Sequence, residues 1–165
     1  MNAYFTADLH LGHKNIIQYC NRPFSSTEEM DTVIIDNWNS IITEKDIVYI
    51  IGDFAVCGKQ QAMEYEHRLG GHKILIRGGH DNYRRGLFET YDYLDRKING
   101  ITFIMFHYPL LTWNKEYYGS IHLHGHNHNN PIEAKKNRVN VGVDAWKFTP
   151  VSIDEIISIS PIWLT

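Results

Sequence analysis

Short apolar runs and amphipathic stretches alternate through the first half of the chain. Three of the apolar runs have the length of buried strands and lie at residues 3–7, 47–51 and 73–77. Residues 30–42 place apolar side chains on one face of a helix, and residues 60–69 precede a glycine pair that can end a second helix. This order predicts strands that alternate with helices.

The second half of the chain has the pattern of strands and tight turns. Four runs predict strands, at residues 91–97, 101–107, 120–124 and 138–143. Asn99-Gly100 lies between the first two runs and favours a hairpin turn. A serine and a glutamate in capping-box spacing precede the helix in 30–42 and a short helix near Ile156; the pairs are Ser26–Glu29 and Ser152–Glu155. Together these elements predict an α/β sandwich with a mixed sheet.

Length and composition predict one globular domain, residues 1–165. Apolar residues make up 43% of the chain and charged residues 21%, which is typical of a protein with a packed core. The net charge of −3 argues against stable binding to duplex nucleic acid, which needs a positive surface. No apolar run approaches the length of a membrane span. Two cysteines and a start without a basic, apolar leader favour a cytoplasmic chain.

Histidine and aspartate gather at the ends of the predicted strands. The chain has ten histidines, and half of them fall in five clusters that follow apolar runs. The clusters are Asp8-Leu9-His10, Gly52-Asp53, Gly78-Gly79-His80-Asp81, His107 and Gly125-His126-Asn127-His128. Because ligands of open α/β sheets bind beyond the carboxyl ends of the strands, we expect the clusters to share one rim.

The residue types in these clusters suit divalent transition metals. Asp8 and His10 are two positions apart, as are His126 and His128, so each pair can project to one side of an extended segment. A carboxylate such as Asp53 can bridge two ions through its two oxygens. Mixed nitrogen and oxygen ligands without thiolate favour Mn, Fe, Zn or Ni over Ca or Mg. Two ions about 3.5–4 Å apart can activate a hydroxide and clamp a phosphoryl group.

The clusters, in their order along the chain, resemble those of the calcineurin-like metallophosphoesterases. The family pattern is D-x-H, G-D, G-N-H-D, a single H and G-H-x-H, and its five segments occur in that order between residues 8 and 128. Phe24, Asn37-Trp38-Asn39 and residues 140–144 also resemble a small subgroup of stand-alone predicted phosphoesterases. The resemblance covers nearly the whole chain, and it implies a four-layer α/β/β/α sandwich with two mixed sheets.

The resemblance also implies a reaction and its ligands. It implies hydrolysis of a small phosphate mono- or diester, nucleotides included, by a metal-bound hydroxide and two divalent ions, with Mn favoured over Fe, Zn or Ni. The implied ligands of the first ion are Asp8, His10 and His128, those of the second are His107 and His126, and Asp53 bridges both. His80 would protonate the leaving oxygen, and Asp81 would hold His80 through a hydrogen bond.

Position 79 departs from the family pattern, because Gly79 stands where the family has an asparagine that binds the second ion. Glycine keeps the loop shape but offers no side-chain oxygen. Weaker binding of the second ion is therefore expected. The departure also supports an alternative function, a non-catalytic or weakened metal-binding scaffold of the same fold. The intact His80, Asp81, His107 and His126 argue against that alternative.

Five other polar residues have roles that the sequence leaves open. His13 lies close to the first cluster and is a candidate contact for a substrate phosphate. Arg22 and Arg77 are candidates to clamp a phosphate, with an ordinary ion pair as the alternative. His122 and His124 alternate with apolar residues, and packing is favoured over metal binding for both.

Overall fold

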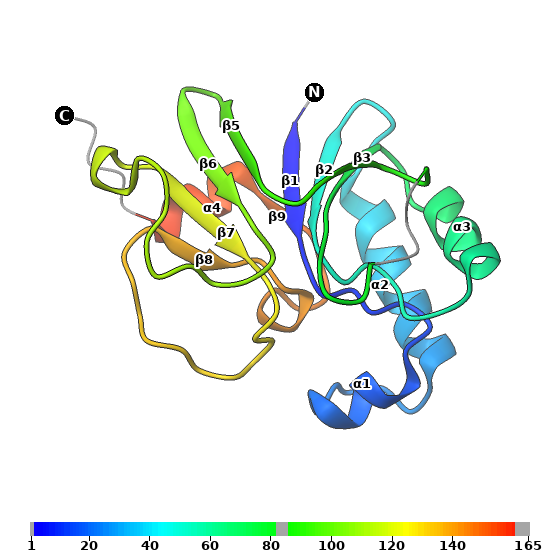
Figure 1. Cartoon of the computed structure of the whole chain (residues 1–165). Coiled ribbons are helices and arrows are strands. Elements are labelled where there is room, and N and C mark those ends of the chain that lie inside the picture. The colour runs from blue at the N-terminus through cyan, green and yellow to red at the C-terminus, as the bar shows by residue number, and fades with distance from the viewer. Residues whose placement is uncertain (1, 82–85, 161–165) are drawn as a thin grey trace.

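Two β-sheets packed face to face form the centre of a computed structural model, which describes residues 2–81 and 86–160 (Figure 1). The first sheet has the strand order β4-β3-β2-β1-β9, and the second has the order β5-β6-β7-β8. The strands of the first sheet are β1 (Ala3–Thr6), β2 (Ile47–Ile51), β3 (His72–Ile76), β4 (Glu89–Tyr91) and β9 (Val151–Ser152). Those of the second sheet are β5 (Leu94–Ile98), β6 (Ile101–Met105), β7 (Ile121–His124) and β8 (Arg138–Asn140).

Both sheets contain parallel and antiparallel pairs. In the first sheet β1, β2, β3 and β4 run parallel to their neighbours, and β9 is antiparallel to β1. In the second sheet β5 and β6 form an antiparallel hairpin around Asn99-Gly100, and β6, β7 and β8 are parallel. The predicted α/β sandwich with two mixed sheets is therefore confirmed.

The outer face of the first sheet is covered by helices. The described part of the chain as a whole has the α-helices α1 (Lys14–Tyr19), α2 (Thr27–Ile41), α3 (Lys59–Arg68) and α4 (Ile153–Ile159), and the short 3-10 helices η1 (Glu116–Tyr118) and η2 (Val143–Ala145). α2 and α3 lie against the first sheet, where Trp38 of α2 is fully buried in one cluster with Val48 and Ile50 (Figure 1). Within the described part of the chain, no helix is both long and apolar enough to cross a membrane.

The strand β2 is apolar throughout because both of its faces are buried. Val48 and Ile50 pack toward the helices, and Tyr49 and Ile51 pack toward the second sheet. The ring of Phe5 on β1 lies 5.4 Å from that of Tyr49 and 5.1 Å from that of Phe103 across the sandwich. Burial on two faces explains why the sequence has a continuous apolar run there rather than an alternating one.

Residues 107–120, which include η1, cover the outer face of the second sheet and form the fourth layer of the sandwich. This layer is thin because a loop and a short 3-10 helix form it. His122 of β7 points to this side, where its Nε2 accepts a hydrogen bond from the backbone N–H of Leu110 and its ring lies 5.3 Å from that of Trp113. α4 instead adds Ile153 and Ile156 to the core between the sheets.

The structure differs from the sequence prediction in its short elements. The predicted strand 91–97 is split, because the chain crosses from β4 in the first sheet to β5 in the second. The elements α1 and β9 were not predicted, since six and two residues are too few for a periodic pattern. The capping box at Ser152 is complete, whereas the carboxylate of Glu29 accepts from Ser25 and only half of that box forms.

Candidate metal centre

The predicted ligands lie at one rim of the sandwich, as expected. Asp8, Asp53, His107 and His126 each come two residues after a strand, respectively β1, β2, β6 and β7. Backbone hydrogen bonds join the first two loops, since Asp8 N–H donates to the Gly52 carbonyl at 3.0 Å and His10 N–H to the Asp53 carbonyl at 2.9 Å. Both sheets therefore contribute side chains to the same place.

Most of the predicted ligands have an uncommon backbone conformation. Five of the six have φ values between 48° and 73°, in the left-handed region; these are Asp8, His10, Asp53, His126 and His128. This conformation costs a non-glycine residue on the order of 1 kcal/mol, and residues that adopt it gather at functional sites. The loops of this rim thus hold five of the eleven non-glycine residues that adopt this conformation in the described part of the chain.

Two buried imidazoles converge on one carboxylate oxygen. His10 Nε2 lies 3.5 Å and His107 Nε2 lies 3.4 Å from Asp53 Oδ2. The three side chains are 2%, 0% and 5% exposed, and among the described residues neither Nε2 atom has a hydrogen-bond partner. A buried nitrogen without a partner is costly in a protein. Two cations that share the Asp53 carboxylate would each bind one of these nitrogens. The arrangement therefore fits a bridged metal pair.

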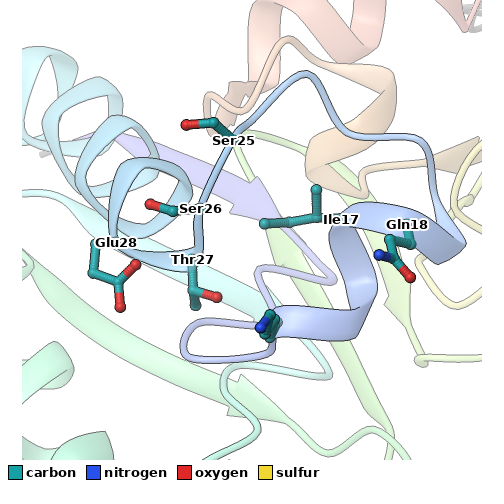
Figure 2. A pocket seen from close by; sticks show the side chains of 7 residues that line it. Ile17, Gln18, Ser25, Ser26, Thr27 and Glu28 are labelled. Carbon is teal, nitrogen blue, oxygen red and sulfur yellow. The ribbon is translucent and has the colours of Figure 1, made fainter.

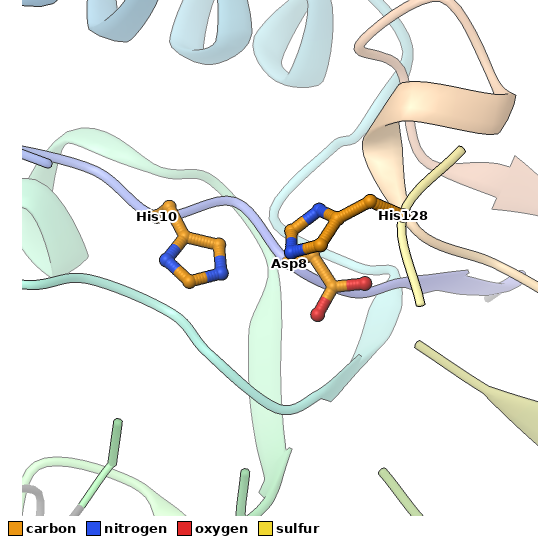
Figure 3. Close-up of side chains that lie close together, drawn as sticks. All are labelled: Asp8, His10 and His128. Carbon is orange, nitrogen blue, oxygen red and sulfur yellow. The ribbon is translucent and has the colours of Figure 1, made fainter. Parts of the chain in front are cut away.

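The ligand atoms form overlapping groups whose members all lie within 4.8 Å of one another. Asp8, His10 and His128 form one group, and Figure 3 shows these three side chains close together. The other groups around the same carboxylates are Asp8–Asp53–His107 and His10–Asp53–His80. Because the groups share members, they form one continuous cluster of possible ligand atoms.

Burial sets the charge state of this centre. Burial lowers the pKa of His10 to about 3, which keeps the imidazole neutral and able to bind a cation. Burial likewise raises the pKa of Asp8 to about 6, against the opposing attraction of His107 and His128. For Asp53, burial alone would raise the pKa, but the adjacent His107, the hydrogen bond from the backbone N–H of His80 and attraction to His10 lower it, so this carboxylate stays ionised.

Two glycines allow the backbone to approach the ligands closely. A Cβ on Gly125 would lie 2.6 Å from Asp8 Oδ2, and one on Gly52 would lie 2.2 Å from His107 Nδ1. Gly52 also has a φ of 87°, which L side chains rarely adopt. Any larger residue at these positions would displace a predicted ligand.

His126 lies beside the centre and less deeply than the other predicted ligands. Its backbone N–H donates to both oxygens of Asp8, at 3.1 and 2.9 Å, while its side chain is exposed. The ring centroid is 5.2 Å from that of His107. Among the described residues, no group of three ligand atoms within 4.8 Å includes His126.

The expected hydrogen bond between Asp81 and His80 is wrong. Both oxygens of Asp81 instead accept backbone N–H groups, from Asp53 at 2.7 Å, Phe54 at 3.0 Å and Gly78 at 2.8 Å. Asp81 is buried and joins two loops, whereas His80 is exposed at the rim with its ring 5.3 Å from that of His10. The backbone N–H of His80 donates to Asp53 Oδ1 at 2.8 Å. Asp81 therefore holds the loop that carries Asp53.

The expectation that Arg22 contacts a phosphate is also wrong. Its side chain is fully buried, and it pairs with Asp144 through Nε at 2.8 Å and Nη2 at 2.9 Å. Its remaining N–H groups donate to the carbonyls of Asp8 and Leu9. Asp144 Oδ2 in turn lies 2.8 Å from His128 Nδ1, which leaves the other nitrogen of His128 for a metal.

Sequence reasoning missed the role of Asp144, which lies in the segment 140–144 that entered only through the family resemblance. Burial alone would raise the pKa of Asp144, but His128 and Arg22 lower it below its ordinary value. Cys20 Sγ is grouped with Asp144 and His128. Burial raises the pKa of this thiol to about 11, so Cys20 stays protonated and is a poor metal ligand.

The remaining candidates divide between the rim and the core. His13 Nδ1 lies 3.2 Å from His10 Nδ1, so His13 does reach the centre. His122 and His124 are buried on β7 with their Nδ1 atoms 3.0 Å from the Ile104 carbonyl and 2.9 Å from the Gly125 carbonyl. Arg77 pairs with Asp92. Of these residues, His13 is the one that contacts a predicted ligand at the rim.

A separate pocket of about 290 Å³ lies between α1 and the start of α2 (Figure 2). Its lining residues are Lys14, Ile17, Gln18, Ser25, Ser26, Thr27 and Glu28. None of the predicted ligands lines this pocket. It is therefore distinct from the metal centre.

The chain is similar along most of its length to proteins of archaeal, phage and bacterial origin. It is 37% identical to the uncharacterized protein MJ1445 of Methanocaldococcus jannaschii, over 94% of this chain and 89% of that one. It is 28% identical to the Gene 66 protein of Mycobacterium phage L5, over 94% and 92% of the two chains. No family model matches the sequence.

Solved structures also align with the chain. AQ665 of Aquifex aeolicus, a protein of unknown function, aligns with a TM-score of 0.79 and 25% identity, over 95% of this chain and 98% of that one. An archaeal phosphodiesterase aligns with a TM-score of 0.47 and 15% identity, over 86% and 82% of the two chains, a likeness too weak to bear on activity.

Proposed function

The chain belongs to the same protein family as MJ1445 of Methanocaldococcus jannaschii, and from that premise we propose that it is a metal-dependent phosphoesterase. The proposed reaction is the hydrolysis of a small phosphate mono- or diester, such as a nucleotide, with two divalent transition-metal ions. The motif resemblance supports the reaction class, and the arrangement of the rim supports the metal requirement.

One observation carries the proposal. His10 Nε2 and His107 Nε2 are buried, have no hydrogen-bond partner in the part of the chain that the structure describes, and lie 3.5 and 3.4 Å from Asp53 Oδ2. A carboxylate between two imidazoles is the arrangement expected of a bridge between two cations. An ordinary structural role would leave neither nitrogen without a partner, because buried polar groups are normally hydrogen-bonded.

The donor set is suited to a transition metal. Asp8, Asp53, His10, His107 and His128 offer carboxylate oxygens and imidazole nitrogens, which favour Mn, Fe, Zn or Ni over Ca or Mg. Bound ions would polarise a phosphoryl oxygen and lower the pKa of a water molecule. We propose Mn²⁺ as the first ion to test.

The residues of the chain then have distinct roles. Asp53 places its carboxylate between the two imidazoles, and the buried Asp81 holds the Asp53 loop through the backbone. His80 is exposed at the mouth of the centre, where its imidazole can give a proton to the leaving oxygen. His126 is proposed as an outer ligand of the second ion. His13 is proposed to contact the substrate phosphate.

The proposal is tested by metal loading and hydrolysis together. Metal-free protein is loaded with Mn²⁺, its metal content is measured, and p-nitrophenyl phosphate and bis-p-nitrophenyl phosphate are offered as substrates. Chelator should abolish turnover, Asp53→Asn should lower the metal content, and His80→Ala should lower turnover by about 100-fold or more with the metal retained.

The matched control is His67→Ala, because His67 is a histidine on α3 whose side chain is 73% exposed and lies outside the metal-ligand groups. It should change neither metal content nor turnover. Turnover that survives both chelator and Asp53→Asn would refute the proposal. Bound metal without turnover on either ester would instead favour the scaffold function that the loss of a side chain at Gly79 suggests.

A further inference from the structure

A tyrosine hydroxyl lies where a side chain on Gly79 would point. Gly79 follows Gly78 and precedes His80, in the loop whose backbone bonds to Asp53 Oδ1. Among the described residues, the atom that a Cβ built on Gly79 would meet is the hydroxyl oxygen of Tyr108, at 3.2 Å. Tyr108 comes from the opposite sheet, directly after His107 and the end of β6. The Tyr108 hydroxyl therefore lies beside the position that a side chain at residue 79 would occupy.

The Tyr108 ring is held against two histidines of the centre. Its centroid lies 4.9 Å from that of His107 and 4.5 Å from that of His126, both in edge-on contacts. The residue is nevertheless 40% exposed. A ring that packs on His107 and His126 and also reaches solvent can present its hydroxyl to a molecule bound at the centre.

The chemistry of a phenol suits a phosphoryl group there. The Tyr hydroxyl is a hydrogen-bond donor, and a phosphate ester at the centre would present anionic oxygens between the ions and the His80 loop. We propose that Tyr108 donates a hydrogen bond to the substrate phosphoryl group, on the side of the metal centre where Gly79 has no side chain. This inference rests on the proposed phosphoesterase function.

The test removes the hydroxyl and keeps the ring. For Tyr108→Phe with Mn²⁺ loaded, we expect binding of inorganic phosphate, measured by calorimetry, to weaken by about tenfold to a hundredfold, as for a lost hydrogen bond to a charged group. The value of kcat/KM for p-nitrophenyl phosphate should fall by a similar factor. Mn²⁺ content and the thermal unfolding midpoint should stay unchanged, because the contacts of the ring with His107 and His126 remain.

The control is Tyr117→Phe, because Tyr117 lies in the segment that follows Tyr108 and is 94% exposed. It should leave phosphate binding and kcat/KM unchanged. A second comparison places Tyr108→Phe in the Gly79→Asn background. The added amide can donate from the same space, so the effect of Tyr108→Phe should there shrink to a few-fold.

The outcomes separate this inference from the function on which it rests. Wild-type protein that hydrolyses no phosphoester and binds no phosphate refutes the proposed function. Wild-type turnover with an unchanged Tyr108→Phe variant refutes the role of Tyr108 alone. A loss of Mn²⁺ in Tyr108→Phe also overturns it, because the hydroxyl would then act on the ions. So does an equal effect of Tyr108→Phe with glycine and with asparagine at position 79, because the hydroxyl would then act independently of that position.

Discussion

Replacing Asp144 by asparagine should weaken both the fold and the metal centre. Asp144 accepts hydrogen bonds from Arg22 at 2.8 and 2.9 Å and pairs with His128 Nδ1 at 2.8 Å. Arg22 also bonds to the backbone carbonyl of Asp8 at 2.7 Å. An amide has the same shape, but its nitrogen must face one of the donors of Arg22 or His128.

The magnitude follows from burial. The Arg22 and Asp144 side chains are 0% and 1% exposed, so solvent cannot screen the loss of charge. Removing one partner of a buried ion pair costs about 3–5 kcal/mol. We expect Asp144→Asn to lower the free energy of unfolding by about 3 kcal/mol, since the amide keeps one acceptor and Arg22 keeps two carbonyls. Loss of the partner of a ligand histidine should weaken Mn²⁺ binding by about 10–100-fold.

Urea unfolding of the metal-free protein and calorimetric titration with Mn²⁺ measure the two effects separately. Asp36→Asn on the exposed side of α2 makes the same chemical change and is the control, with less than about 0.5 kcal/mol expected. If Asp144→Asn unfolds within about 1 kcal/mol of the wild type and binds Mn²⁺ equally well, the ion pair does not hold His128 and the reasoning fails.

Three further predictions concern other positions. Gly79→Asn should tighten the second ion and raise turnover, because Gly79 has no positive φ and, among the described residues, its Cβ would meet the flexible end of the Tyr108 side chain; unchanged Mn²⁺ stoichiometry and rate would contradict this. Gly125→Ala should lower stability by about 1–3 kcal/mol and reduce Mn²⁺ content, because its Cβ would lie 2.6 Å from Asp8 Oδ2; calorimetry and metal analysis measure this, and normal content would count against close packing. Hydrogen bonds from Thr43 and from the backbone N–H of Asn2 lower the pKa of Asp46 to about 2. The ionised Asp46 carboxylate therefore stabilises the fold above about pH 4, and this stabilisation is lost as the pH falls toward 2. In Asp46→Asn the free energy of unfolding should depend less on pH over that window, and a pH dependence equal to that of the wild type would exclude the effect.

The sequence was most informative where burial leaves a local pattern. The run at 47–51 predicted β2 because both faces of that strand are covered, and the helix face in 30–42 predicted α2 because one side of it meets the sheet. The candidate metal ligands were also visible locally, since aspartate and histidine at the ends of apolar runs are rarely placed there for packing. The roles of Asp8, Asp53 and His107 in one centre could be proposed for that reason.

The tertiary structure decided which partner each polar group has. Arg22 and Asp144 are 122 positions apart, and Asp81 bonds to the loop after β2, 28 positions away. The order of the strands brings these groups together, and no local periodicity records that order. The split of 91–97 between two sheets and the Tyr108 hydroxyl over Gly79 have the same origin. Hydrophobic patterning depends on the immediate neighbours of a residue, whereas hydrogen-bond partners depend on how distant segments meet, so the chain alone predicts the former and only the folded molecule determines the latter.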